Sequence, residues 1–301
     1  MHDNPPRPGG LSDDRPVASP EALPFVSCLC PTYRRPRLLA NALACYLWQD
    51  YPADRRELIL LDDAGQFEPQ RGPGWELVSI PRRFRSLPEK FNALAGLARG
   101  EILVVWEDDD IYLPWHITAH VEALTPECGF SKPSRVRSHV EGAWHEEAAA
   151  GRFHASIAFR RAALRAVGGW PLTPRGDFDQ QLLSRLAELG PSGDPVARRP
   201  PSYVFRWETT GDYHGQDLMR GPDDEGWYQR VAELGSGTPQ PLLVPRFDPQ
   251  TRECFHEWEI TGLTTWESPR AADPTREMFS RHSEDADSAA TPPGPPGEPE
   301  F

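Results

Sequence analysis

Four consecutive acidic residues follow an apolar run at positions 102–106; they are Glu107, Asp108, Asp109 and Asp110. A short apolar run of this kind predicts a buried strand, so the acids are expected where that strand leaves its sheet. Adjacent carboxylates repel one another, and their desolvation is costly unless cations or hydrogen bonds compensate for it. Such hard oxygen ligands suit Mg²⁺ or Mn²⁺, so the run is a candidate site for a divalent metal ion. A solvated acidic turn is the alternative interpretation.

Polar residues also follow two earlier apolar runs, at positions 25–30 and 57–61. The first run is followed by Pro31, Thr32, Tyr33 and Arg34, and the second by Asp62 and Asp63. Neighbouring strand ends in an open α/β sheet form a crevice for ligands, where a carboxylate can accept hydrogen bonds from a nucleobase or a ribose. A turn that merely ends the strand explains the two aspartates equally well. The chain has no GxGxxG motif, which disfavours a dinucleotide site, and no GxxxxGK(S/T) motif, which excludes a P-loop.

Apolar periodicity predicts the elements that must position these groups. Strands are expected at 25–30, 57–61, 75–80 and 102–106, with one helix beginning near Pro36 and another at 87–100 that closes on Gly100. This order predicts an α/β fold, a mostly parallel sheet flanked by helices. Further along, helices are expected at 115–124, 160–169 and from about Asp177, strands at 156–159 and 203–207, and short elements at 242–244 and 254–260.

The composition limits the classes of function. A net charge of −13 argues against binding to nucleic acid or to an anionic membrane, and no apolar run reaches the roughly 18 residues of a membrane span. The first residues lack the apolar core of a signal peptide, so secretion is not expected. Five cysteines without metal-binding spacing fit a reducing cytoplasm. Residues 1–23 and 270–301 are rich in polar residues and proline and are predicted to be disordered.

Three blocks of sequence, taken in order, resemble the family 2 glycosyltransferases, which have the GT-A fold. The first, VSCLCPTYRRPRLLANALACYLWQDYPADRRELILLDDAG, resembles the family's strand, PTYNR, helix, Q-x-Y segment and strand ending in DDGS. The second, EKFNALAGLARGEILVVWEDDDIYLP, resembles K-x-N and A-x-G leading into W-D-D-D-D-W-Y-x-P. The third, GGWPLTPRGDFDQQLLSRL, resembles GG followed by E-D-x-D-L and a helix. Each block alone is weakly specific, whereas the ordered set is strongly so.

The resemblance implies a transferase that takes a sugar from a nucleoside-diphosphate donor with inversion at the anomeric carbon. It implies that Glu107, Asp108 and Asp109 form the D-x-D motif, with Glu where the family usually has Asp. Asp109 would then be the principal metal ligand and Asp110 its neighbour, while Glu107 and Asp108 would face the donor. The residues implied to line the pocket for the nucleotide, expected to be uridine, are Pro31, Thr32, Tyr33, Arg34, Asp62 and Asp63.

Lys90 and Asn92 would face the nucleotide or the donor sugar. Only Lys90 and Lys132 of the 32 basic residues are lysines, which draws attention to Lys90 as a compact charge for a phosphate. A solvated position on a helix is the alternative for Lys90. The nearby arginines Arg82, Arg83 and Arg85 could equally hold phosphate or offset local acids.

The resemblance implies that Asp177 is the catalytic base, although Gly176 precedes it where the family usually has Glu. Capping of the following helix is the alternative role for Asp177, because acids favour the first helical turn. A later histidine can complete a metal site in some GT-A enzymes, which makes His214 a candidate ligand. The other histidines fit no trusted ligand spacing; they include His116, His120, His139, His145 and His154.

These observations predict a metal-dependent enzyme with Mn²⁺ or Mg²⁺ and with a nucleotide-sugar half at 24–114 and an acceptor-side half at 115–269. The expected partners are a nucleotide-diphospho-sugar donor and a glycan, lipid-linked or small-molecule acceptor. Two rival functions stay open. One is a nucleotidyltransferase of similar topology, and the other is a catalytically inactive GT-A-like binding protein.

Overall fold

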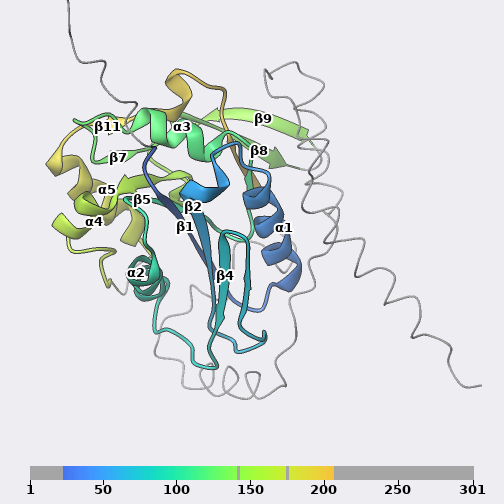
Figure 1. Ribbon diagram of the computed structural model, residues 1–301. Helices are drawn as coiled ribbons and strands as arrows, with labels where there is room; N and C mark the ends of the chain where they lie inside the picture. The colour runs from blue at the N-terminus through green and yellow to red at the C-terminus, as the bar shows by residue number, and fades with distance from the viewer. Residues whose placement is uncertain (1–22, 141–142, 174–175, 207–301) are drawn as a thin grey trace, which may run out of the picture.

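The computed structural model describes residues 23–140, 143–173 and 176–206 (Figure 1). Several sequence predictions fall outside these ranges. They are nearly all of the N-terminal tail, the C-terminal tail at 270–301, the elements at 242–244 and 254–260, and the candidate ligand His214.

The described residues form a main sheet of eight strands in the order β11-β7-β10-β5-β1-β2-β4-β3. Its centre is parallel and consists of β5 (Ile102–Val105), β1 (Val26–Thr32), β2 (Arg56–Asp62) and β4 (Trp75–Ser79). The remaining strands are β3 (Gln70–Gly72), β7 (Phe130–Ser131), β10 (Ala158–Arg160) and β11 (Ser192–Gly193). The predicted α/β fold with a mostly parallel sheet is therefore confirmed.

Two helices cover opposite faces of the parallel strands (Figure 1). Helix α1 (Pro36–Leu47) connects β1 to β2, and α2 (Leu87–Leu97) connects β4 back to β5 across the sheet. Because parallel crossovers are right-handed, connections that run in opposite directions place their helices on opposite faces. All seven residues of β1 and all seven of β2 are buried, which explains why the middle of each strand is rich in apolar residues.

Helix α2 ends earlier than the sequence predicted. Its start is capped by Ser86, whose hydroxyl accepts a hydrogen bond from the Glu89 amide at 3.3 Å. Its last residue is Leu97, so Gly100 is not the C-cap. A Cβ atom at Gly100 would lie 2.5 Å from the backbone nitrogen of Ser27 in β1. Gly100 therefore allows the chain to pass close to the neighbouring strand, a use of glycine that resembles a helix stop in the sequence.

A second sheet of four strands, in the order β6-β12-β8-β9, lies beside the first in the described part of the chain. Its strands are β6 (Ile111–Tyr112), β12 (Tyr203–Arg206), β8 (Arg135–Val140) and β9 (Ala143–Ala148). The sequence predicted only β12. Strand β6 begins directly after Asp110, so this sheet holds the far end of the acidic run.

Three further helices follow the acidic run: α3 (His116–Ala123), α4 (Arg161–Ala166) and α5 (Phe178–Leu189). Short 3₁₀ helices are η1 (Ala53–Arg55), η2 (His154–Ser156) and η3 (Pro195–Ala197). The Trp106 indole stacks on the Tyr112 ring at a centroid distance of 3.9 Å, which packs the ends of β5 and β6 together. Within the described residues, every helix is too short or too polar to cross a bilayer.

Candidate functional site

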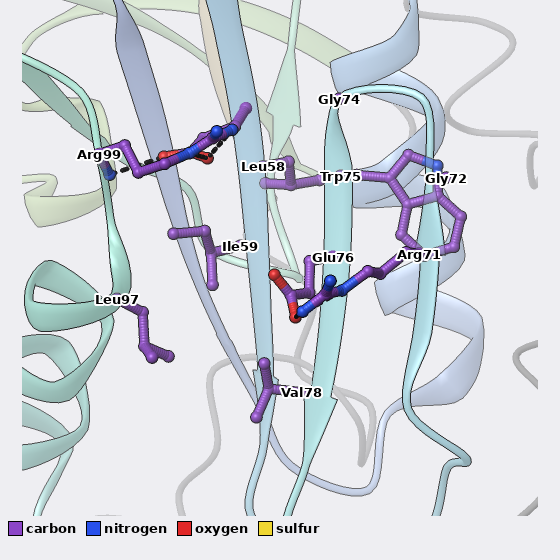
Figure 2. A pocket seen from close by; sticks show the side chains of 11 residues that line it. Leu58, Ile59, Arg71, Gly72, Gly74, Trp75, Glu76, Val78, Leu97 and Arg99 are labelled. Atoms are coloured by element: carbon purple, nitrogen blue, oxygen red, sulfur yellow. Dashed lines mark hydrogen bonds and ion pairs between the residues drawn. The ribbon is translucent and has the colours of Figure 1, made fainter.

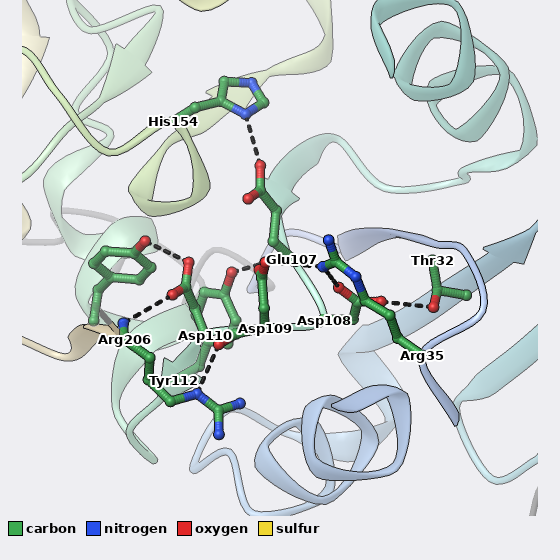
Figure 3. Close-up of polar contacts among 10 residues, drawn as sticks. Thr32, Arg35, Glu107, Asp108, Asp109, Asp110, Tyr112, His154 and Arg206 are labelled. Carbon is green, nitrogen blue, oxygen red and sulfur yellow. Dashed lines mark hydrogen bonds and ion pairs between the residues drawn. The ribbon is translucent and has the colours of Figure 1, made fainter. Parts of the chain in front are cut away.

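The acidic run lies between β5 and β6, at the edge of the sheet where β1 and β2 also end (Figure 3). In the register of the parallel strands, Thr32 pairs with Asp62, and Leu29 pairs with Val105. The ends of the three strands therefore meet at one edge, as the sequence predicted. Open α/β sheets bind ligands at this carboxyl edge.

Asp108 is buried and held on both carboxylate oxygens. It accepts a hydrogen bond of 2.6 Å from the Thr32 hydroxyl and forms an ion pair of 2.8 Å with Arg35. The same Arg35 nitrogen lies 2.8 Å from an Asp109 oxygen, so one guanidinium bridges two acids of the run (Figure 3). Burial raises the pKa of Asp108 to about 6, while the Arg35 charge acts in the opposite direction.

Asp110 is fully buried and faces the second sheet. The Tyr203 hydroxyl donates to one of its oxygens at 2.5 Å, and the backbone amide of Arg206 donates to the other at 3.3 Å. The Arg206 side chain donates to the backbone carbonyl of Asp109 at 2.6 Å. Burial raises the pKa of Asp110 well above its usual value, and the neighbouring Asp109 charge acts in the same direction. Strand β12 therefore fixes the end of the run.

Glu107 is partly exposed, and its carboxylate lies beside the His154 ring (Figure 3). Its carboxylate oxygen lies 3.1 Å from Nδ1 of His154, and its backbone amide donates to the Tyr112 hydroxyl at 2.7 Å. The spacing of His154 in the sequence matches no ligand pattern. Its contact with Glu107 arises from the fold, across 47 positions of sequence.

The acidic run has the ligand chemistry of a divalent cation site. Oxygens of Glu107, Asp109 and Asp110 lie within 4.8 Å of one another. Three hard carboxylate ligands around one point fit Mg²⁺ or Mn²⁺. Asp108 is not part of this group: both of its carboxylate oxygens are engaged, one by Thr32 and the other by Arg35, which also binds Asp109.

Asp62 and Asp63 lie at the end of β2 but have different surroundings. Asp62 accepts hydrogen bonds from the Ser79 hydroxyl at 2.7 Å and from the backbone amides of Ala64 and Gln66. Burial raises the pKa of Asp62, while these hydrogen bonds oppose that shift. Asp62 therefore shapes the turn that follows β2, which supports the turn interpretation.

Asp63 is the anion of a buried cluster that contains two cations. Lys90 and Arg83 bind the same Asp63 oxygen at 2.5 and 2.8 Å. Lys90 also donates to the Thr32 carbonyl at 2.5 Å, and burial lowers its pKa, against the effect of Asp63. Lys90 is therefore not a solvated helix residue. Arg83 stacks over the Tyr33 ring, with its guanidinium carbon 3.4 Å from the ring centroid.

The remaining predicted residues have distinct locations. Pro31 is buried in β1, and Arg34 is exposed with a positive φ of 57°. Asn92 binds the backbone nitrogen and oxygen of Trp170, both at 2.9 Å. A Cβ atom at Gly169 would lie 2.4 Å from the Asn92 side-chain oxygen, so the Gly-Gly pair allows this contact. Asn92 thus anchors the segment that leads to Asp177.

Asp177 occupies the N-cap position of α5 but forms no side-chain capping hydrogen bond. Its carboxylate instead accepts a hydrogen bond from the side-chain amide (Nε2) of Gln181 at 3.1 Å. The capping alternative therefore does not account for its side chain. The next residue, Phe178, packs edge-on against His154 with ring centroids 5.3 Å apart. The His154 side chain thus lies between the start of α5 and Glu107.

Four residues of this site had no predicted role: Arg35, His154, Tyr203 and Arg206. Arg35 is adjacent to the predicted PTYR segment, and its position just before α1 was the available signal. The other three reach the acids through pairings in the second sheet and through η2, which carry no local pattern in the sequence.

A separate hollow of about 400 Å³ lies near the opposite, amino-terminal ends of β2 and β4 (Figure 2). Leu97 and Trp75 contribute to its lining. Its charged groups are already paired with one another, Arg71 with Glu76 at 2.6 Å and Arg99 with Glu57 at 2.7 Å. The hollow therefore lacks the excess of converging acidic groups that characterises the acidic run.

The fold of this chain is similar to that of solved structures. No family model matches the chain, and no curated protein matches its sequence. Residues 1–349 of TarS from S. aureus share its fold with a TM-score of 0.50 and 12% identity, over 60% of each chain. The same TarS segment in complex with UDP-GlcNAc gives a TM-score of 0.51 and 12% identity, over 62% of this chain and 60% of that one. The chain thus spans about 60% of the TarS segment, and it has a GT-A-like fold.

Proposed function

We propose that the protein transfers a sugar from a nucleoside-diphosphate donor, expected to be a UDP-sugar, to an acceptor hydroxyl. The observation that carries this proposal is the meeting of Thr32, Asp62, Asp63 and the acidic run at the carboxyl edge of one parallel sheet. The fold adds support, because a TarS structure with the same fold contains UDP-GlcNAc. Residues 24–114 would bind the donor and 115–269 the acceptor, in a protein of the cytoplasm.

In this proposal, the nucleotide lies across the ends of β1 and β2. A carboxylate offers about four lone-pair positions, and Asp62 and Asp63 each accept three hydrogen bonds, so each retains one for a base or ribose. The Tyr33 ring, covered on one face by Arg83, would line the same pocket with Pro31, Thr32 and Arg34. Lys90 would face the nucleotide side of the pocket through its cluster with Asp63.

Glu107, Asp109 and Asp110 would hold the divalent ion, with Glu107 also facing the donor. When bound, such an ion supplies Lewis-acid stabilisation of the charge that grows on the leaving pyrophosphate. Asp108 would stay with Thr32 and Arg35, and its contribution is to keep that guanidinium beside the phosphate site. His214 is proposed as a further ligand and lies outside the described residues.

Asp177 would act as the base in a single displacement. Its carboxylate takes the proton of the acceptor hydroxyl while the acceptor oxygen forms a bond to the anomeric carbon. The bond from that carbon to the phosphate oxygen breaks at the same time, and its electron pair leaves with the nucleoside diphosphate. Attack from the face opposite the leaving group inverts the anomeric configuration, so no covalent enzyme intermediate is required.

A thermal-shift screen tests this function. UDP, GDP, CDP and dTDP are each added with and without Mn²⁺, because a ligand that binds the native state raises its stability by mass action. We expect UDP with Mn²⁺ to raise the melting temperature more than UDP alone and more than the other nucleotides. The absence of a shift with any nucleotide would overturn the proposal.

A catalytically inactive binding protein is the second candidate, and a specific observation favours it. Arg35 already neutralises Asp108 and Asp109, two acids of the D-x-D motif, and Gly176 stands where the family usually has an acid. This candidate predicts nucleotide binding without turnover of any nucleotide sugar. The nucleotidyltransferase alternative is separated by its product, because it would release pyrophosphate instead of a nucleoside diphosphate.

A further inference from the structure

His154 lies between the acidic run and the helix that begins beside Asp177. It is the first residue of η2, and 8% of its surface is exposed. Its Nδ1 atom is 3.1 Å from a Glu107 carboxylate oxygen, and its ring packs edge-on against Phe178. A single buried side chain therefore contacts both the first acid of the run and the first residue of α5.

Trp170 fixes which nitrogen of His154 carries the hydrogen. The indole Nε1 lies 2.9 Å from Nε2 of His154, and an indole N–H can only donate. Nε2 must therefore present its lone pair to Trp170, which leaves the hydrogen on Nδ1, facing Glu107. The imidazole is thus a donor to the Glu107 carboxylate.

The surrounding aromatic residues hold this arrangement in place. Phe91 stacks on Trp170 at a centroid distance of 5.0 Å and packs edge-on against His154 at the same distance. Asn92, the next residue of α2, binds both backbone groups of Trp170. The orientation of the imidazole is therefore set by three residues that lie outside the acidic run.

We propose that His154 is a positioning residue. Its Nδ1–H group donates a hydrogen bond that orients the Glu107 carboxylate towards the nucleotide sugar and its metal ion. The inference rests on the proposed function and deepens it. It also gives a reason for Glu at position 107, because the additional methylene carries the carboxylate to the imidazole. Hydrogen-bond partners of ligating groups typically change metal affinity or activity about 10–100-fold when they are removed.

Two variants separate the hydrogen bond from the packing. His154→Phe keeps a ring against Phe91 and Phe178 but removes the donor to Glu107. His154→Asn loses the ring but keeps an N–H at the position of Nδ1. We expect His154→Phe to weaken Mn²⁺-dependent UDP binding in calorimetry about 10–100-fold. His154→Asn is expected to bind close to the wild-type affinity despite a lower melting temperature. The inference would be overturned if UDP affinity fell in parallel with the melting temperature, regardless of whether the variant keeps an N–H group facing Glu107.

A double-mutant cycle with Glu107→Gln tests whether His154 acts through Glu107. Residues that act through one hydrogen bond are non-additive, so His154→Phe should have little further effect on binding in the Glu107→Gln background. An equal effect in both backgrounds would contradict the inference. If the wild-type protein binds UDP and His154→Phe leaves binding unchanged, the inference fails alone. If the wild-type protein binds no nucleotide, the proposed function fails with it.

Discussion

The four adjacent acids are compatible with one fold because every one of them has a partner outside the run, and three different residues share this role. The partners are Arg35 for Asp108 and Asp109, Tyr203 for Asp110, and His154 for Glu107. Desolvated carboxylates require such compensation. The partners also divide the run into groups with different exposure, from the partly exposed Glu107 to the fully buried Asp110.

At the scale of single residues, Asp177→Asn tests the assignment of the base. The amide cannot take a proton, and positioned general bases typically contribute about 10²–10⁴-fold to rate. We expect kcat to fall by that order, measured by nucleoside-diphosphate release from a nucleotide sugar. Calorimetry should show unchanged donor binding, because Asp177 lies outside the proposed nucleotide pocket at the ends of β1 and β2. Turnover like that of the wild-type protein would contradict the assignment.

The cluster around Asp63 gives an asymmetric prediction for stability. Asp63→Asn leaves Lys90 and Arg83 without their shared anion, and uncompensated buried charges cost about 3–5 kcal/mol. Lys90→Met should reduce the free energy of unfolding by less, because Arg83 still neutralises Asp63. Urea denaturation of the two variants measures both values. The reverse order would show that Lys90 is the essential charge of the cluster.

The sequence predicted the acids correctly as a group but not their partners. The carboxyl ends of β1, β2 and β5 were readable because each follows an apolar run that is buried on both faces. Arg35 directly follows the predicted segment 31–34, but its role could not be predicted because its contact with Asp108 spans 73 positions. The role of His154 could not be predicted from ligand spacing, because the orientation of its imidazole depends on Trp170, a contact made by the fold.

At the scale of elements, the central strands and helices were predictable and the second sheet was not. Strands β6, β8 and β9 are short or amphipathic, and β6 pairs with β12 across about ninety positions of sequence. Such pairings depend on tertiary context, so local patterns do not contain them. The prediction that Gly100 ends α2 was wrong for the same reason, because the constraint on Gly100 comes from β1.

Two buried histidines of α3 connect that helix to its surroundings and make stability depend on pH. His116 Nδ1 lies 2.9 Å from the Ser202 hydroxyl, and His120 Nδ1 lies 2.6 Å from the Ser131 hydroxyl. Burial lowers the pKa of His116 well below its usual value and lowers that of His120 to about 3, although the charge of Asp194 opposes the second shift. Both rings are therefore neutral in the native state at moderately acidic pH.

Histidines in the unfolded chain take up protons below about pH 6.5, whereas the native rings do so only at lower pH. The unfolded state thus binds more protons in this window, and the free energy of unfolding should fall as the pH drops from about 6.5 towards the His120 value. Urea denaturation between pH 7.5 and 5 measures the slope. The double variant His116→Asn and His120→Asn should show a shallower slope, and an unchanged slope would assign the effect to other groups.

At the scale of the whole molecule, the hollow lined by Trp75 and Leu97 and the acidic site lie at opposite ends of the parallel strands. The acidic site draws on both sheets, because β5 delivers the acids and β12 fixes Asp110. The start of α5 reaches the same region through the contact of Phe178 with His154. The fold therefore brings the carboxyl ends of the parallel strands, the acidic run and the start of α5 into one neighbourhood.

The central claim is that the strand ends and the acidic run form one site for a nucleotide and a divalent ion. Calorimetric titration of UDP with and without Mn²⁺, on the wild-type protein and on Asp109→Asn, tests it most directly. We predict that UDP binds the wild-type protein much more tightly with Mn²⁺ and that Asp109→Asn loses this dependence. Mn²⁺-independent binding, or equal binding by Asp109→Asn, would contradict the claim.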